Sequence, residues 1–278
     1  MELFTRGWYK ESCRKLHLHP EKGRGQNFLI DEKICEKITD IGGATAEMVV
    51  EVGPGFGILT KQLVKQAKKV IALDLEKKFI DLLPETLGNP KNLETITADF
   101  LEYGIEQFPK PFRIIANLPY SISSETLFLL VESRNLPESI TLLLQKEVVL
   151  RASQKPPNGN QLALGMHLYG NPTLALGVSK NSFYPSPKVD SGVLHVKKHH
   201  ENHEVSLALG KGNLSISEVL KVSRGPFLSP RKQIGKTLAA IFGDKALLAL
   251  ERVGVSKETR PEKITTLEWI AIADALNT

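Results

Sequence analysis

Apolar residues in the first half of the chain occur in short continuous runs that alternate with segments of helical periodicity. Runs of this length, rich in Val, Ile and Leu, predict strands that are buried on both faces. The predicted strands are Met48–Val52, Lys69–Asp74, Leu93–Asp99, Phe112–Leu118 and Ile140–Leu144, and helices are expected at Ile58–Gln66, Glu76–Leu83 and Glu125–Glu132. This alternation predicts a parallel, doubly wound α/β sheet with right-handed crossovers.

The pattern changes after Lys146. A turn-rich break at Lys155–Asn160 precedes two more predicted strands, Ala175–Ser182 and Gly192–Lys198, which should close the sheet. The chain then favours short amphipathic helices: Ile216–Val222, Arg231–Phe242, Ala246–Val253 and Leu267–Leu276. We therefore expect an N-terminal arm over residues 1–25, a Rossmann-like domain over residues 26–200 and a small all-helical domain over residues 201–278.

Length and composition limit the class of protein. With 278 residues, 41% of them hydrophobic, the chain can bury one sizeable core and a smaller module. It has no apolar run of about 18 residues and no block typical of a secretory signal. Two cysteines without paired spacing, and seven histidines without a metal-binding pattern, argue against a zinc site and a disulfide framework. We expect a cytoplasmic protein without a metal or a membrane anchor.

The net charge of +5 is unevenly distributed. Residues 26–150 carry 13 basic and 18 acidic side chains, whereas the flanking segments sum to +10. Basic flanks are typical of a protein that binds a polyanion, because each phosphate contact releases counterions. Ordinary solvated lysines are the alternative explanation, and charge alone does not separate the two.

A glycine-rich loop, Glu51–Gly57, follows the first predicted strand and opens a helix. Its glycines allow a sharp turn and let a ligand lie against bare backbone. Asp74 ends the next strand, where a carboxylate accepts hydrogen bonds from the ribose hydroxyls of an adenosine cofactor. The pair indicates a nucleotide-containing cofactor, either NAD or S-adenosylmethionine.

Three features favour S-adenosylmethionine. The loop has GxGxG spacing, whereas dinucleotide oxidoreductases carry GxGxxG. Asp99 ends the third strand, where it can bond the adenine amine of the cofactor. The sequence Asn117-Leu118-Pro119-Tyr120 ends the fourth strand, and ligands of doubly wound sheets lie at the carboxyl ends of the strands.

This NLPY turn has a chemical use. The Asn117 amide oxygen and a carbonyl beside Pro119 can accept both hydrogens of an adenine N6 amine and free its lone pair for methyl transfer. Tyr120 offers a ring on which the base can stack, and Phe183, in FYPSP, is a second candidate for clamping it. A structural asparagine in a Pro-Tyr turn, and a core role for Phe183, are the plainer alternatives.

Together these motifs resemble a known family, the ribosomal RNA adenine dimethyltransferases, and most closely its bacterial KsgA/RsmA type. The resemblance spans most of the chain and rests on GQNFLID, EVGPGFGILT, VIALD, ADFLEY, NLPYSIS, QKEV, FYPSPKVDSGV and RPEKIT, in that order. It implies dimethylation of two adjacent adenosines near the 3′ end of small-subunit ribosomal RNA, on a maturing small subunit. We expect the protein to be a monomer. The resemblance also implies a cofactor site formed by Gln26, Asn27, Leu29, Gly53, Asp74, Asp99 and Asn117.

Three departures from the family's pattern stand out. Asp74 replaces the usual glutamate, and the segments Lys155–Gly170 and Arg231–Leu238 differ from the family's runs. Two other functions remain open. One is a large-subunit methyltransferase of the erythromycin-resistance type, whose typical GxGKG and NIPY differ from the GPGFG and NLPY of this chain. The other is a non-catalytic RNA-binding assembly factor on the same scaffold.

Overall fold

A computed structural model describes residues 3–17 and 27–277, and it divides the chain into two compact units. Unit 1 contains residues 1–129, 135–149 and 173–196, and unit 2 contains residues 130–134, 150–172 and 197–278. The chain passes into unit 2 for the last time at Lys197, close to the boundary expected after residue 200. Residues 150–172, however, belong to unit 2 and not to the α/β domain in which the sequence pattern placed them.

Unit 1 is built on a seven-stranded sheet with the order β4-β3-β2-β5-β6-β9-β7. The first five strands in this order, β4-β3-β2-β5-β6, are parallel to one another, and β7 pairs with β9 in the antiparallel direction. The strands are β2 (Met48–Val52), β3 (Lys69–Asp74), β4 (Leu93–Thr97), β5 (Arg113–Asn117), β6 (Ser139–Gln145), β7 (Thr173–Val178) and β9 (Ser191–Lys197). All seven predicted strands are confirmed: the bounds of β2 and β3 are as predicted, and the ends of the other five are shifted by up to four residues.

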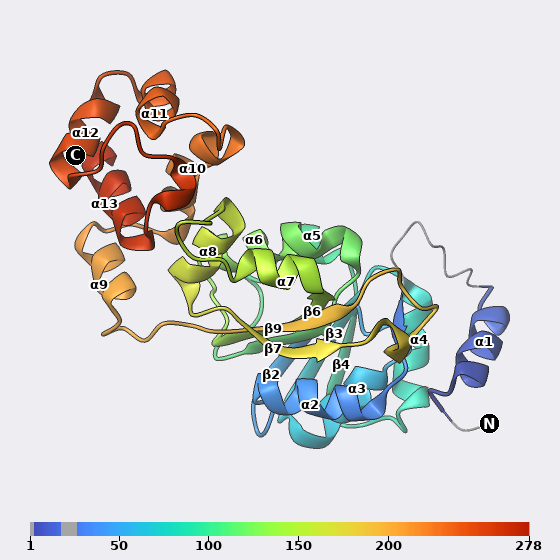
Figure 1. Cartoon of the computed structure of the whole chain (residues 1–278). Coiled ribbons are helices and arrows are strands. Elements are labelled where there is room, and N and C mark those ends of the chain that lie inside the picture. Colours follow the sequence, from blue (N-terminus) through green and yellow to red (C-terminus); the bar gives the residue numbers. More distant parts are fainter. Residues whose placement is uncertain (1–2, 18–26, 278) are drawn as a thin grey trace. The chain divides into compact units, whose positions relative to one another are not determined.

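Helices cover both faces of this sheet, as the continuous apolar strands require. Figure 1 shows α2 and α3 on one side and α5 and α6 on the other. Side chains of α2, α3 and α4 share one core cluster, which includes Ile38, Leu63 and Phe79. The helices are α2 (Glu32–Gly42), α3 (Ile58–Gln66), α4 (Lys77–Thr86), α5 (Phe100–Tyr103), α6 (Ser123–Glu132) and α7 (Lys146–Ala152).

The N-terminal segment was predicted to be a basic arm over residues 1–25, of which residues 1–2 and 18–25 lie outside the described residues. Residues Arg6–Lys15 form helix α1, which buries Tyr9 and Cys13 in the core of unit 1. The Tyr9 hydroxyl donates a 2.7 Å hydrogen bond to the Leu29 carbonyl. Leu29 belongs to the short strand β1 (Phe28–Leu29), which pairs with β8 (Phe183–Tyr184). The described part of this segment therefore helps to form the α/β domain, although Arg6, Lys10 and Arg14 remain exposed.

Unit 2 is helical. It contains the four predicted helices, found as α10 (Ile216–Leu228), α11 (Ile234–Phe242), α12 (Lys245–Val253) and α13 (Thr266–Asn277), together with α8 (Gln161–Tyr169) and α9 (Glu204–Lys211), which were not predicted. Gly165 of α8 packs on α10, since a β-carbon there would lie 3.4 Å from Leu220 Cδ1. That contact explains why residues 150–172 join the helical unit.

Candidate active site

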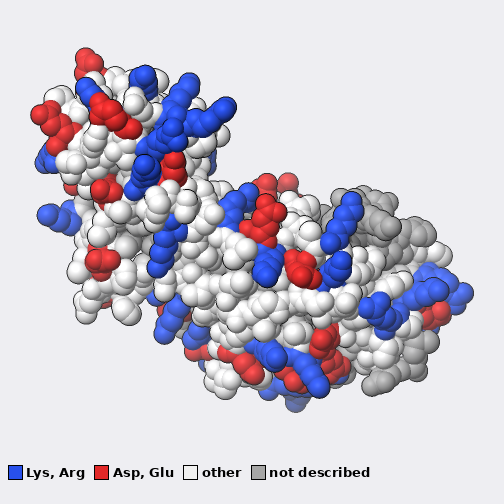
Figure 2. Space-filling model, viewed as in Figure 1, with Lys and Arg blue, Asp and Glu red and all other residues white. Residues whose placement is uncertain are grey.

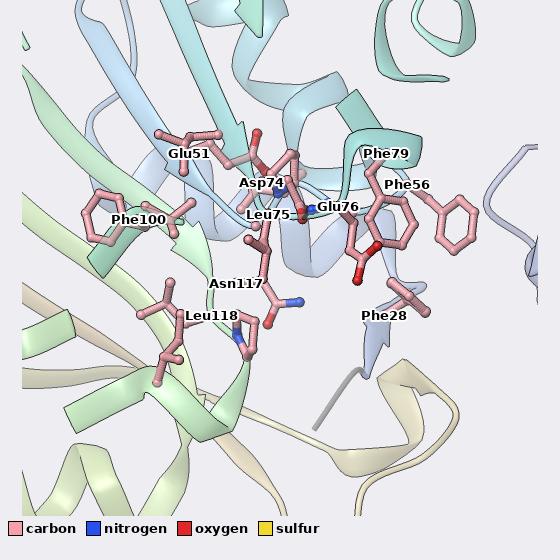
Figure 3. A pocket seen from close by; sticks show the side chains of 18 of the residues that line it. Phe28, Glu51, Phe56, Asp74, Leu75, Glu76, Phe79, Phe100, Asn117 and Leu118 are labelled. Carbon is pink, nitrogen blue, oxygen red and sulfur yellow. Dashed lines mark hydrogen bonds between the residues drawn. The ribbon is translucent and has the colours of Figure 1, made fainter. Parts of the chain in front are cut away.

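The carboxyl ends of β2, β3 and β5, with the segment after β4, surround a cavity of about 580 Å³ (Figure 3). Its size is ordinary for a small-molecule site. Gln26 lies outside the described residues. The cavity is lined by eight of the predicted site residues: Asn27, Leu29, Gly53, Asp74, Asp99, Asn117, Pro119 and Tyr120.

At two glycines of the loop after β2, the wall of the cavity is formed by backbone without a side chain. Gly53 has a φ of +69°, and a β-carbon there would lie 3.4 Å from Pro119 Cδ. Gly55 has a φ of +54°, and its β-carbon would lie 3.3 Å from the Phe28 ring. Side chains at either position would be strained and would fill the cradle, so bare backbone faces the ligand.

Asp74 ends β3 and points its carboxylate at this loop. Its Oδ1 accepts a hydrogen bond from the Glu76 N–H at 2.9 Å, and its Oδ2 accepts one from the Gly55 N–H at 3.4 Å. Burial raises the pKa of Asp74 to about 6, although these two backbone hydrogen bonds act in the opposite direction. Asp74 is therefore mostly ionised at pH 7 and can accept hydrogen bonds from a ligand's hydroxyls.

Asp99, which follows β4, also lines the cavity. It caps the N-terminus of α5, where its Oδ1 accepts a 2.8 Å hydrogen bond from the Leu101 N–H. Capping holds the carboxylate in place, as expected of an aspartate at a helix N-terminus. Asp99 thus presents an oriented acceptor to the part of the ligand that lies beyond β4.

The turn after β5 brings Asn117 into the site. Figure 3 shows its amide projecting into the open middle of the cavity. Leu118 is buried, and its N–H donates to the Leu143 carbonyl of β6, which fixes the turn against the sheet. The Pro119 carbonyl accepts from the Ile122 N–H at 3.3 Å and from the Ser123 hydroxyl at 3.4 Å.

Tyr120 begins the short 3₁₀ turn that follows (Tyr120–Ile122). Its hydroxyl shares a 2.7 Å hydrogen bond with the hydroxyl of Ser191, which is fully buried at the start of β9. Burial raises the pKa of Tyr120, so the phenol is neutral in the physiological range. The hydrogen bond fixes the ring at the rim of the cavity, where it can serve as a stacking face.

Phe183 does not have the position predicted for it. It is fully buried in the core of unit 1, opposite Leu29 in the β1–β8 pair, and it does not line the cavity. A ring enclosed in this way has no open face on which a base could stack. The plainer alternative, a core role, is the correct one, because the short strand turns this side chain inward.

Several residues of the cavity wall were not predicted. Phe28, Phe56 and Phe79 form edge-to-face ring pairs with centroids 4.8–5.7 Å apart. Glu51 is fully buried, its Oε2 has no hydrogen-bond partner, and burial raises its pKa to about 8. An acid inside the apolar run Met48–Val52 was the signal for Glu51, whereas nothing local marks the aromatic rings as neighbours.

Comparison with known proteins defines the family. Residues 20–278 match the family model described as "Ribosomal RNA adenine dimethylase". The chain belongs to this family. Among curated relatives, the "Ribosomal RNA small subunit methyltransferase A" of Mycoplasmopsis pulmonis is 35% identical and that of Listeria welshimeri is 32% identical. These alignments cover 92% and 99% of this chain, and 98% and 97% of the relatives.

Solved structures related to this dimethylase-family chain confirm the predicted fold class. A crystal structure of a dimethyladenosine transferase from Plasmodium falciparum matches with a TM-score of 0.74 and 24% identity, covering 88% of this chain and 95% of that one. The 23S rRNA methyltransferase ErmE matches with a TM-score of 0.68 and 24% identity, covering 91% and 100%. The chain therefore has a Rossmann-like methyltransferase fold with a C-terminal helical region.

Membership of this family makes S-adenosylmethionine the cofactor, and the cavity fits it. The bare glycine cradle and the two oriented carboxylates, Asp74 and Asp99, provide acceptors for an adenosine, and the unpartnered Glu51 Oε2 offers another buried hydrogen-bonding atom. Within residues 3–17 and 27–277, no group of three or more His, Cys, Asp or Glu side chains is arranged to hold a metal ion. In the same ranges, no helix combines the length and apolar character needed to cross a membrane.

Proposed function

We propose that this chain is an S-adenosylmethionine-dependent ribosomal RNA (adenine-N6,N6-)dimethyltransferase. Its substrate is the pair of adjacent adenosines near the 3′ end of small-subunit (16S) RNA, which it modifies as a cytoplasmic monomer during subunit maturation. The observation that carries this proposal is the Asn117 amide, which projects from the NLPY turn into the cofactor cavity. The two relatives named above support the choice of the small subunit, since both carry that subunit in their names.

The turn performs its chemistry by accepting hydrogen bonds. The cofactor supplies an electrophilic methyl group, and the adenine N6 amine is a weak nucleophile because its lone pair is delocalised into the ring. The Asn117 amide oxygen accepts one N6 hydrogen. The Pro119 carbonyl already accepts two hydrogen bonds, so we assign the second N6 hydrogen to the Leu118 carbonyl on the other side of Pro119. Acceptors fixed in this way stabilise the positive charge that develops on nitrogen.

Tyr120 positions the base. Its ring faces the cavity while its hydroxyl is anchored on Ser191, so stacking costs little side-chain entropy. Base–aromatic stacking contributes about 1–3 kcal/mol at comparable sites. Nucleobases that react in enzyme pockets are turned out of their stack, and such a ring then holds one face of the base.

The helical unit supplies a surface for the RNA backbone. Figure 2 shows Lys and Arg side chains gathered over the part of this unit where α10 and α11 lie. Arg231, Lys232 and Lys236 are exposed there, and Lys257 is adjacent, because its carbonyl accepts a 2.9 Å hydrogen bond from Gly235 N–H of α11. We call these four residues the α11 cluster and propose that they bind phosphates.

Methyl transfer to ribosomal particles tests this function. Small and large subunits from a strain that lacks adenosine dimethylation would be incubated with the chain and labelled S-adenosylmethionine, and modified nucleotides mapped by mass spectrometry. We expect two adjacent dimethyladenosines near the 3′ end of the small-subunit RNA. Methylation of large-subunit RNA alone would indicate the erythromycin-resistance type of activity, and RNA binding without methyl transfer would indicate an assembly factor.

A further inference from the structure

Two acids lie where β3 ends and α4 begins. Asp74 is the last residue of β3, and a longer acid, Glu76, follows two residues later at the N-cap of α4. The carboxylate of Asp74 is one methylene nearer to its own backbone than a glutamate carboxylate would be. Glu76 has the longer side chain, so its carboxylate can extend further from the backbone than that of Asp74.

The local structure also restricts Asp74. Each of its carboxylate oxygens already accepts a backbone hydrogen bond, from Glu76 N–H at 2.9 Å and from Gly55 N–H at 3.4 Å. A carboxylate oxygen can accept a further hydrogen bond, but these two contacts hold the group against the glycine loop. A ribose presents two adjacent hydroxyl donors, and a short, restricted carboxylate is poorly placed to accept from both.

Glu76 occupies the N-cap position of α4, yet its side chain makes no capping hydrogen bond to that helix. It lines the cavity instead. Figure 3 shows its carboxylate beside the rings of Phe28 and Phe79, facing the open middle of the cavity across from Asn117. The rings limit where the side chain can go, and the acceptor faces the space that the ligand occupies.

We propose that Glu76 is a second ribose-binding residue of this chain, and that Asp74 and Glu76 each accept one of the two cofactor hydroxyls. The inference rests on the proposed function, because it assigns S-adenosylmethionine to this cavity. The short acid at position 74 is then complemented by the longer acid at position 76. Ribose recognition is divided between the end of β3 and the start of α4.

Calorimetry on the full chain tests this division without measuring activity. The variants are Glu76→Gln, Asp74→Asn and the double variant, with Glu85→Gln as a matched control, because Glu85 is an exposed acid of the same helix that does not line the cavity. The probes are S-adenosylhomocysteine, its 2′-deoxy and 3′-deoxy forms, and 5′-methylthioadenosine. Equal unfolding temperatures would establish that the variants are folded.

We expect Glu76→Gln to weaken S-adenosylhomocysteine binding about tenfold, since it removes a charged acceptor but keeps the size of the side chain. With the deoxy form that lacks the hydroxyl bound by Glu76, the loss of affinity caused by Glu76→Gln should be less than about twofold. With the other deoxy form, the loss caused by Asp74→Asn should be less than about twofold. Glu85→Gln should bind every probe as the unaltered chain does.

Three results would overturn the proposal. If Glu76→Gln binds like Glu85→Gln while the unaltered chain binds well, Glu76 has no role in the site, and the proposed function still stands. If the loss persists with both deoxy forms but disappears with 5′-methylthioadenosine, Glu76 recognises the ammonium group of the cofactor and not its ribose. If the unaltered chain binds none of the probes, the proposed function fails as well.

Discussion

The cavity of unit 1 and the α11 cluster of unit 2 hold their polar side chains in opposite ways. Around the cavity, Asp74, Asp99 and Tyr120 are each fixed by a hydrogen bond within the protein. The cations of the α11 cluster are exposed at the surface. Methyl transfer requires a fixed geometry, whereas phosphate binding requires mainly positive charge. Single changes in the cavity should therefore have large effects, and changes in the cluster small and additive ones.

The largest effect is expected at Asn117. Asn117→Ala removes an acceptor that strengthens as positive charge develops on the amine, so it should reduce the single-turnover methylation rate by about a hundredfold or more. RNA affinity should change far less. Asn202→Ala, at an exposed asparagine of unit 2, is the control and should keep the full rate. If Asn117→Ala retained full activity, our account of amine activation would be wrong.

The next largest effect is expected from Glu51 and depends on pH. Burial raises the pKa of Glu51 to about 8 in the folded chain, compared with an ordinary value of 4.5. Folding therefore takes up a proton between these values, and the contribution of Glu51 to stability declines as the pH rises from about 4.5 to about 8. Glu51→Gln should remove this decline.

Unfolding in denaturant at pH 5.5 and pH 8 measures this effect. The stability of the Glu51→Gln variant relative to the unaltered chain should rise between the two values, by at least about tenfold in the unfolding equilibrium constant. Burial also raises the pKa of Asp74, and its charge contributes to the raised pKa of Glu51, so the comparison measures Glu51 together with this coupling. Parallel pH profiles would show that Glu51 is ionised in the folded chain.

A smaller effect is expected at the anchor of Tyr120. Tyr120→Phe keeps the stacking ring but leaves the buried Ser191 hydroxyl without its partner, and Ser191→Ala does the converse. Loss of one such hydrogen bond corresponds to about 1 kcal/mol, so each variant should lower kcat/KM about fivefold. The double variant should lose little more than either single one. Independent, multiplicative losses would show that the hydroxyl pair does not position the ring.

The smallest effect for each residue is expected in the α11 cluster. Replacing Arg231, Lys232 or Lys236 with Gln should leave the methylation rate at saturating RNA unchanged and reduce the salt dependence of RNA binding. The slope of log affinity against log salt should fall by about one unit for each phosphate that the variant no longer neutralises. Lys33→Gln and Lys37→Gln, on α2, are the controls. An equal slope in cluster and control variants would remove the cluster from the RNA interface.

The sequence alone was sufficient to predict the alternating strands and helices of unit 1 and the edge of the sheet at which the site lies. Buried parallel strands appear as continuous apolar runs, and the residues that end them must meet at one edge of the sheet. Gly53, Asp74, Asp99 and Asn117 all lie around one cavity for that reason. Their positions follow from strand periodicity and from local turn chemistry, both of which can be recognised in a single segment.

Contacts between distant segments could not be predicted in this way. Three contacts join residues that are far apart in the chain. Tyr9 of α1 bonds to Leu29, Phe183 lies opposite Leu29 in the β1–β8 pair, and Tyr120 bonds to Ser191. The packing of α8 on α10, which moved residues 150–172 into unit 2, is of the same kind. Periodicity shows that a side chain is apolar or that a turn is tight, but only tertiary packing determines which partner it meets, because that choice depends on how all the elements fill the core together.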